Sequence, residues 1–293
     1  MAETLLPPAE WTARAEAYGR RIEDFVEPHL RRARAGLPHP VWDFLFRYYS
    51  LRPRQLRVWH PGFGVVLCGS ARPYLDRAGY GPHSAGVTVT TRYLRSRVET
   101  IEFIAGLLRA TAGRSPRLNC FGMHEWAMVY RTPTVRHGQV PLRLGAEGTD
   151  AVVESTPLRC THFDAFRFFT EPAAAMNAGT PSRRNQPAWE QPGCVHANMD
   201  LYKWCYKLGP LIPSELTFDC LQLAAEARAL DMRASPYDLR DYGFTPIAVE
   251  TAAGRAAYSR AQQDIAGRAT PLRAAVVERC DELLVAAMAA AGN

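Results

Sequence analysis

The 293-residue sequence predicts a mainly α-helical protein, a helical single domain over residues 1–293 with a minor β hairpin or small sheet. Three observations support this fold class. Apolar residues recur at helical spacing in most of the long segments. Runs rich in β-branched residues are confined to about residues 60–95. The composition, 47% hydrophobic and 22% charged, is that of a globular chain and excludes disordered and fibrous proteins.

The N-terminal half combines helices with the predicted sheet. Residues 9–35 carry apolar positions at helical spacing, and a second helix is expected in VWDFLFRYYS after the break GLPHP. The runs GVVLCG and GVTVTTRYL, both within residues 60–95, predict two strands. The pattern VETIEFIAGLLRAT over residues 98–111 is typical of an amphipathic helix.

The C-terminal half is predicted to hold three helical regions and two loops. Residues 141–156 are interpreted as a loop with a short strand, and about residues 171–193 as a long loop rich in Pro, Gly, Asn and Ser. The segment CVHANMDLYKWCYKLGP predicts a helix that ends at Gly209, and SELTFDCLQLAAEARALDMR predicts one capped by Ser214. The Ala-rich tail 252–291 predicts one or two outer helices.

The positive charge is carried almost entirely by arginine. The net charge is +6, and of the 35 basic side chains only Lys203 and Lys207 are lysines. A GC-rich genome produces such a skew, and so does recognition of carboxylate or phosphate by the guanidinium fork. A charge of +6 over this length gives only weak support to nucleic-acid binding.

The cysteines and the N-terminal sequence indicate in which cellular compartment the protein is expected. The seven cysteines are odd in number and contain no CxxC pair, which excludes a zinc ribbon and a disulfide scaffold. The N-terminus lacks the basic-then-apolar order of a signal peptide, and no run of eighteen apolar residues occurs. We therefore expect a cytoplasmic protein with no membrane contact, and its oligomeric state stays open, with a homo-oligomer as one alternative.

Three short segments concentrate histidine and carboxylate among aromatic residues. They are CFGMHEWAMVYR with His124 and Glu125, RCTHFDAFRFF with His162 and Asp164, and CVHANMDLYKW with His196 and Asp200. Because positions i and i+4 share a helix face, His196 and Asp200 can point into one cavity. Alternatively, Asp200 pairs with Lys203 or Lys207, and His196 is a hydrogen-bonded core residue. Imidazole ligates Fe, Zn, Cu and Ni, with a carboxylate or carbonyl behind it.

Other motifs narrow the class of protein. HExxH, GxSxG, GxxxxGK[ST] and GxGxxG are absent, which excludes the zinc-protease helix and argues against common hydrolases, nucleotide-triphosphate enzymes and Rossmann oxidoreductases. The segment DMRASPYDLRDYG places Arg233 beside a Pro bend. This segment is either a clamp for a carboxylate or propionate, or a solvated helix end with salt bridges.

Five stretches resemble an actinobacterial family routinely labelled 3-methyladenine DNA glycosylase. They are CFGMHEWAMVYR, GTDAVVES, RCTHFDAFRFF, EQPGCVHANMDLYKWCYKL and LDMRASPYDL, and the similarity extends from about Trp11 to Arg273. The label implies a DNA-repair enzyme acting on methylated bases, with Asp164, Asp200 or Glu125 activating water. The sequence departs from established glycosylases, because it has neither an LPGVG-like hairpin nor a periodic helical repeat.

The chain also resembles the histidine-ligated heme-dependent aromatic oxygenases, which include tryptophan dioxygenases and bacterial tyrosine hydroxylases. Some relatives carry HxxxC, whose His ligates the heme iron and whose Cys attaches the porphyrin. The matching motif here runs from His196 to Asp200, so the resemblance implies His196 as axial ligand of a noncovalent heme. A porphyrin needs a wide apolar slot, an axial imidazole and cations for its propionates. Aromatic-rich helices, His196 and many arginines supply these ingredients.

The first functional hypothesis is an oxidoreductase: a heme-dependent mono-oxygenase or hydroxylase acting on a small aromatic, tyrosine-like substrate with dioxygen or peroxide. The roles divide into a metal ligand (His196), cofactor-binding residues (His196, Asp200, Arg233), catalytic residues (His124, His162, Asp164) and substrate-binding residues (Arg131, Glu125). A neutral imidazole suits acid–base work because its pKa lies near working pH.

Two alternatives come from other classes. One is the DNA glycosylase, with arginines holding the phosphates of the nucleic acid. The other is a non-heme Fe or Zn enzyme, whose site combines His124, His162 and His196 with Asp164 or Glu125.

Overall fold

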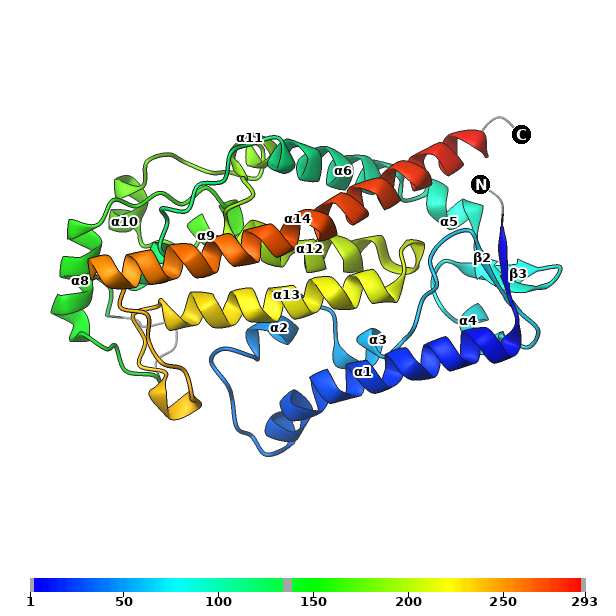
Figure 1. Cartoon of the computed structure of the whole chain (residues 1–293), viewed down its shortest axis with the longest axis horizontal. Coiled ribbons are helices and arrows are strands. Elements are labelled where there is room, and N and C mark those ends of the chain that lie inside the picture. The colour runs from blue at the N-terminus through cyan, green and yellow to red at the C-terminus, as the bar shows by residue number, and fades with distance from the viewer. Residues whose placement is uncertain (1–2, 134–138, 291–293) are drawn as a thin grey trace.

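Helices make up most of the structure, a computed structural model that describes residues 3–133 and 139–290. The molecule is elongated, with one small sheet at the end where both termini lie (Figure 1). This arrangement confirms the mainly α fold class with a minor sheet.

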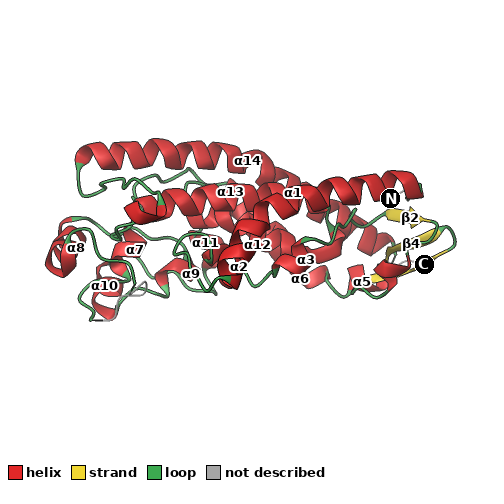
Figure 2. Cartoon of the chain, turned by 90° about the horizontal axis from the view of Figure 1, so that it is seen from below, coloured by secondary structure: helices red, strands yellow, loops and turns green. Residues whose placement is uncertain are grey.

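Three long C-terminal helices form the centre. They are α12 (Val195–Leu208), α13 (Ser214–Arg233) and α14 (Ala252–Ala289), which contact one another and lie side by side in both views (Figure 1, Figure 2). Helix α6 (Val98–Ala112) packs against α14 and α12. The turn from α12 into α13 passes through a 3-10 helix, η1 (Gly209–Leu211). The four long helices therefore lie where helical periodicity predicts them.

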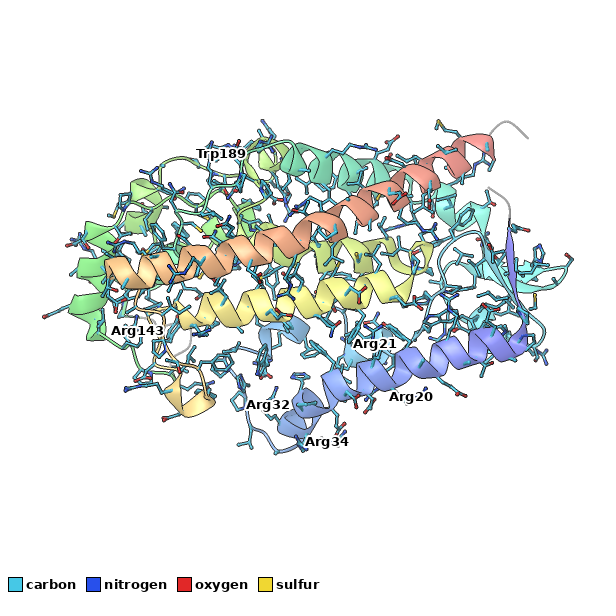
Figure 3. The ribbon with its side chains drawn as sticks, in the orientation of Figure 1. Arg20, Arg21, Arg32, Arg34, Arg143 and Trp189 are labelled. Atoms are coloured by element: carbon cyan, nitrogen blue, oxygen red, sulfur yellow. The ribbon has the colours of Figure 1, made fainter. Side chains whose placement is uncertain are left out.

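The N-terminal helix α1 (Pro8–Arg34) lies on the outside and packs Tyr18, Ile22 and Val26 inward. Arg20 and Arg34 project from its outer side (Figure 3). None of the helices in residues 3–133 and 139–290 is both long and apolar enough to span a lipid bilayer.

The small sheet contains four strands in the order β1-β2-β4-β3: β1 (Thr4–Leu6), β2 (Val65–Cys68), β3 (Tyr80–His83) and β4 (Gly86–Val89). β1 is parallel to β2, and the other pairs are antiparallel. The predicted β region is confirmed, but β1 was not predicted because three residues are too few to show a period. The run GVTVTTRYL is only half strand, since the Thr90 side chain caps helix α5 (Thr91–Arg95) by accepting from Tyr93 N.

The remaining elements are short. Among those with buried residues are α2 (Phe44–Arg47), α3 (Pro53–Leu56), α4 (Arg72–Leu75), α7 (Met123–Ala127) and α9 (Phe163–Phe166). The 3-10 helix η2 (Arg240–Tyr242) has none. The predicted helix in VWDFLFRYYS therefore shrinks to the single turn α2. Ser214 belongs to α13 rather than capping it, because its hydroxyl accepts from His60 N.

Two loop predictions are wrong in part. In residues 141–156 the predicted short strand is reduced to an isolated antiparallel β-bridge between Leu142 and Tyr237. Most of this stretch is the helix α8 (Gly145–Ser155), which buries Thr149, Val152 and Val153 at helical spacing. The stretch 171–193 is interrupted by α10 (Glu171–Met176) and α11 (Gln186–Trp189). Each begins with a Gln or Glu followed by Pro, and the Thr170 hydroxyl accepts from Ala173 N. Pro in the first turn of a helix favours the start of that helix. The same prolines also indicate a loop in the sequence, so the two short helices were not predicted.

Candidate metal centre

Three histidines from distant parts of the sequence meet in the interior. His124 lies in α7, His162 directly precedes α9, and His196 is in the first turn of α12. The ring centroids of His124 and His196 are 4.4 Å apart, and those of His162 and His196 are 5.3 Å apart. The His196 ring therefore touches both others, and the three segments singled out in the sequence converge on one place.

The first group of potential ligands is His124, His196 and Asp231, whose donor atoms all lie within 4.8 Å of one another. His124 Nε2 lies 2.9 Å from Asp231 Oδ1, and His196 Nε2 lies 3.9 Å from Asp231 Oδ2. Asp231 is fully buried on α13. Helices α12 and α13 pack directly together, so His196 and Asp231 face each other across that interface.

Burial and the neighbouring charges set the pKa values of His124, His196 and Asp231. Burial, with His124 and His162 nearby, holds the pKa of His196 well below its ordinary value, so its imidazole is neutral. Burial disfavours the charged form of His124, but the Asp231 carboxylate outweighs burial and raises the pKa of His124. Burial would likewise raise the pKa of Asp231, but His124 lowers it to about 2. The metal-free group thus holds a neutral His196 imidazole and an ionised Asp231 carboxylate, the forms that bind metal, whereas the raised pKa of His124 means that a metal ion would have to displace its proton.

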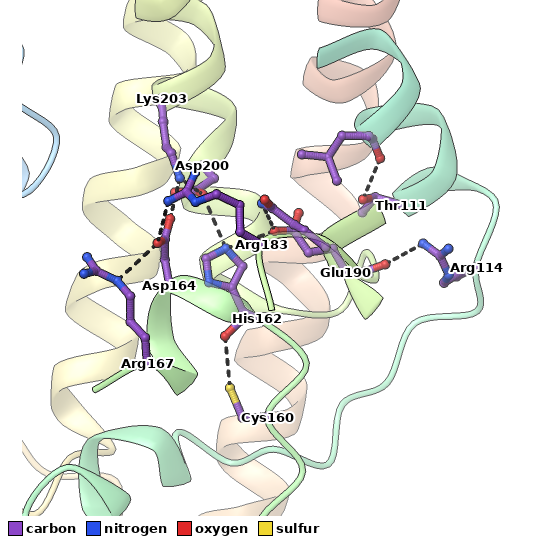
Figure 4. A network of polar contacts seen from close by, with 12 residues as sticks. Thr111, Arg114, Cys160, His162, Asp164, Arg167, Arg183, Glu190, Asp200 and Lys203 are labelled. Atoms are coloured by element: carbon purple, nitrogen blue, oxygen red, sulfur yellow. Dashed lines mark hydrogen bonds and ion pairs between the residues drawn. The ribbon is translucent and has the colours of Figure 1, made fainter. Parts of the chain in front are cut away.

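The second group is His162, Glu190 and Asp200, again with all donor atoms within 4.8 Å. His162 Nε2 lies 3.3 Å from both Glu190 Oε1 and Asp200 Oδ2, and all three side chains are about 1–2% exposed. Figure 4 shows the His162 ring between the two carboxylates. Within the described residues, neither ring nitrogen of His162 completes a hydrogen bond of proper geometry.

Lys203 fixes one side of the second group. Its Nζ lies 2.7 Å from Asp164 Oδ2 and 2.8 Å from Asp200 Oδ2 (Figure 4). Tyr49 donates its hydroxyl to Asp200 Oδ1 at 3.2 Å. Burial would lower the pKa of Lys203, but Asp200 and Asp164 raise it above its ordinary value, so the ammonium stays charged. Of the two lysines considered as partners of Asp200, Lys203 is the one that pairs with it, whereas Lys207 is exposed.

A second buried cation, Arg228, lies beside the first group. Its Nη1 donates to Glu125 Oε1 at 2.7 Å and to Asp231 Oδ2 at 3.3 Å. All three side chains are buried. Glu125, expected to bind substrate, therefore forms a buried ion pair at the edge of the cluster.

A pocket of about 390 Å³ reaches His196. Its lining combines aromatic and charged side chains, including Phe44, Tyr48, Phe168, Arg47, Glu125 and Arg228. The rings of Phe44 and Tyr48 stack with centroids 4.6 Å apart. A second cavity, which His124 and His196 share with Cys160, holds only about 20 Å³. Small-molecule sites typically occupy about 300–1,000 Å³, so of these two cavities beside His196 the first is the one large enough for a substrate.

The chemistry of these donors fits a metal ion better than a porphyrin. Imidazole nitrogens and carboxylate oxygens at close range form the usual ligand sets of iron, zinc and manganese. A heme needs a wide apolar slot on the axial histidine. The larger space beside His196 has the charged side chains of Glu125, Asp164 and Arg228 among its aromatic walls, so it is not a purely apolar slot, and the smaller space is too narrow. The geometry therefore favours the non-heme alternative.

Six of the eight residues predicted for the site come together, and two do not. Arg131 is exposed and pairs with Glu154, with 2.5 Å between Nη2 and Oε1. Arg233 is exposed at the end of α13 and donates to the Thr245 carbonyl at 3.0 Å. Neither makes an ion pair or hydrogen bond to the cluster in the described structure, because both side chains point to the protein surface.

Three residues of the cluster escaped the sequence analysis: Glu190, Arg228 and Asp231. Arg228 and Asp231 left a usable signal, because two charged residues three apart in the apolar run ARALDM share one buried helix face. Glu190 left none, since a Glu in a loop-like stretch is ordinarily exposed.

Comparisons with family models, with curated proteins and with solved structures found no match to this chain. The resemblances to the family labelled as glycosylases and to the heme-dependent oxygenases stay predictions.

Proposed function

We propose that this protein is a non-heme metal enzyme, an oxidoreductase that holds an iron ion at His124, His196 and Asp231 and oxidises a small aromatic substrate. The observation that carries the proposal is the first ligand group itself: two imidazoles and one carboxylate within 4.8 Å, one of them lining a pocket of substrate size. Two histidines and one carboxylate with open coordination positions are typical of non-heme iron oxygenases.

The residues around the ion have distinct tasks. When bound, the iron supplies redox chemistry with dioxygen or peroxide. His196 offers its lone pair without first losing a proton, because its pKa is depressed by burial. Arg228 holds Asp231 Oδ2 from behind at 3.3 Å, which fixes the orientation of that carboxylate. Partners of this kind are part of most metal sites.

The pocket supports a small aromatic substrate that carries a carboxylate. Phe44, Tyr48 and Phe168 provide aromatic walls, and the Arg228 guanidinium lies 4.2 Å from the centre of the Phe44 ring. Arg47 lines the same pocket and pairs with Asp43 Oδ2 at 3.5 Å, but its side chain is 73% exposed, so its guanidinium can turn from this partner toward an incoming carboxylate. Arg47 takes the role that the sequence assigned to Arg131.

The DNA-glycosylase alternative finds less support. A phosphate-binding face needs arginines that are not already neutralised. Many surface arginines pair with carboxylates instead, among them Arg14 with Glu215, Arg21 with Asp219, Arg57 with Glu23 and Arg268 with Glu226.

Metal analysis tests the proposal. We expect protein loaded anaerobically with Fe(II) and desalted to retain iron without a Soret band, and His196→Gln and Asp231→Asn to lose it. The matched control is His60→Gln, which alters a half-buried histidine that is hydrogen-bonded to Tyr80 outside the cluster and should retain iron like the wild type.

Four outcomes would overturn the proposal. One is wild-type protein that retains no iron, and another is retention that both site variants leave unchanged. The third is a Soret band that His196→Gln removes, which would restore the heme hypothesis. The fourth is zinc bound in preference to iron at the same residues, because Zn²⁺ has no redox chemistry of its own.

A further inference from the structure

We propose that His162, Glu190 and Asp200 form a second divalent-cation site, so that the protein holds two neighbouring metal ions. The proposed function needs only the ion at His124, His196 and Asp231, and this inference goes beyond it. The class of ligand is a divalent transition-metal ion such as Fe(II), Mn(II) or Zn(II), because the donors are one imidazole and two carboxylates.

The distances suit a coordination sphere. Bonds of about 2.0–2.2 Å from a metal to nitrogen or oxygen place neighbouring ligand atoms roughly 3 Å apart. His162 Nε2 lies 3.3 Å from Glu190 Oε1 and 3.3 Å from Asp200 Oδ2. An ion can therefore be bound with little movement of the side chains.

The hydrogen-bonding state of His162 points the same way. The residue is 1% exposed, yet neither of its ring nitrogens completes a hydrogen bond within the described residues. Buried polar atoms almost always have a partner, and those that lack one require an explanation. Coordination of a cation by Nε2 supplies the missing partner.

Glu190 is a buried carboxylate with little to balance its charge. In the described part of the chain, the Glu190 carboxylate has His162 as its one ion-pair partner and accepts a hydrogen bond from Gln186 Nε2 at 2.5 Å, whereas Arg114 contacts the Glu190 backbone carbonyl. Asp200 differs, because Lys203 lies 2.8 Å from its Oδ2. An isolated buried charge is costly, whereas a bound divalent cation compensates it.

The two groups adjoin through α12. The His162 and His196 rings stack at 27° with centroids 5.3 Å apart. His196 belongs to the first group and Asp200 to the second, and they are one helical turn apart on the same face. One helix thus contributes a ligand to each ion. Two neighbouring ions can bind both reacting oxygens of a substrate or dioxygen.

The rival explanation is that Lys203 is the only cation needed. Its ammonium already contacts Asp200 and Asp164, and Arg167 and Arg183 reach Asp164 from the surface. In that case each chain would bind one metal ion, at the first group of ligands. The number of ions per chain separates the two explanations.

The test is metal stoichiometry with Mn(II) as the probe, measured by mass spectrometry after desalting and by electron paramagnetic resonance. We expect two ions per chain in the wild type, with the multiline spectrum of a magnetically coupled pair. His162→Gln and the isosteric Glu190→Gln should each fall to one ion and lose the coupling. His124→Gln should also retain one ion, bound at the second site.

The outcomes distinguish this inference from the proposed function. A wild type with one ion that His124→Gln removes and Glu190→Gln leaves in place would overturn the second site alone. A wild type with no ion would overturn both. Two ions with no magnetic coupling, unaffected by Glu190→Gln, would place the second ion elsewhere and also overturn the inference. Circular dichroism of each variant checks that it is folded.

Discussion

The imidazole of His124 lies 2.9 Å from the carboxylate of Asp231, although the two residues are 107 positions apart in the sequence. Both side chains are buried, and Arg228 adds a second cation to the same carboxylate. The contact joins the short helix α7 to the long helix α13. Asp231 is therefore both a potential metal ligand and the carboxylate that compensates the buried charge of Arg228.

Substitution of Asp231 by Asn should therefore destabilise the metal-free protein. The change leaves Arg228 and His124 without their shared carboxylate, and breaking a buried pair in this way typically costs about 3–5 kcal/mol. We expect the free energy of unfolding in urea to fall by that amount. The matched control is Glu226→Gln, which removes a half-exposed carboxylate paired with Arg268. Exposed pairs contribute about 0–1 kcal/mol, and equal effects of the two substitutions would contradict the burial argument.

The two lysines offer a comparison within one helix. Lys203→Met leaves Asp164 and Asp200 without the ammonium that bridges them at 2.7 and 2.8 Å, and we expect a loss of about 3–5 kcal/mol in unfolding free energy. Lys207→Met changes an exposed side chain one turn further along and should alter stability by less than about 0.5 kcal/mol. Chemical denaturation of both variants measures the difference, and a small effect at Lys203 would mean that the pair is dispensable.

Local patterns accounted for most of the fold, and only part of the site. The helix that holds His196 and Asp200 follows from periodicity, because its turns depend on residues close in sequence. Glu190 and Asp231 become ligand candidates only through contacts with residues distant in the chain, which no spacing within a segment reveals. Arg131 and Arg233 were chosen for their chemistry alone, and the fold turns both outward. Helix α8 was missed because the pair Val152–Val153 has strand propensity, which its packing overrides.

Acid should weaken the protein partly through His60, which lies outside the cluster. Burial, aided by Arg77, lowers the pKa of His60 to about 4 from an ordinary 6.5. A depressed histidine pKa means that the fold favours the neutral form, so stability is full above pH 6.5 and falls as pH drops toward 4. The shift corresponds to roughly 3 kcal/mol.

The prediction is checked by comparing pH profiles of unfolding free energy for the wild type and His60→Gln. The variant has no imidazole to protonate, so its profile should be flatter between pH 6.5 and 4, by up to that amount. Other groups titrate in both proteins and cancel in the difference. Parallel profiles would show that His60 does not contribute.

Arg47 should select substrates that carry a carboxylate. It lines the His196 pocket, so Arg47→Gln removes the cation that the proposed function places against the substrate carboxylate. A hydrogen bond to a charged group is worth about 1.5–3 kcal/mol, which corresponds to roughly a 10- to 150-fold loss of affinity. With L-tyrosine and tyramine as calorimetric probes, we expect the wild type to prefer tyrosine and Arg47→Gln to lose that preference at unchanged metal content. Arg131→Gln, which alters an exposed arginine paired with Glu154, is the control and should retain the preference. If Arg131→Gln abolished it and Arg47→Gln did not, the assignment made from the sequence would be right and the one made from the pocket wrong.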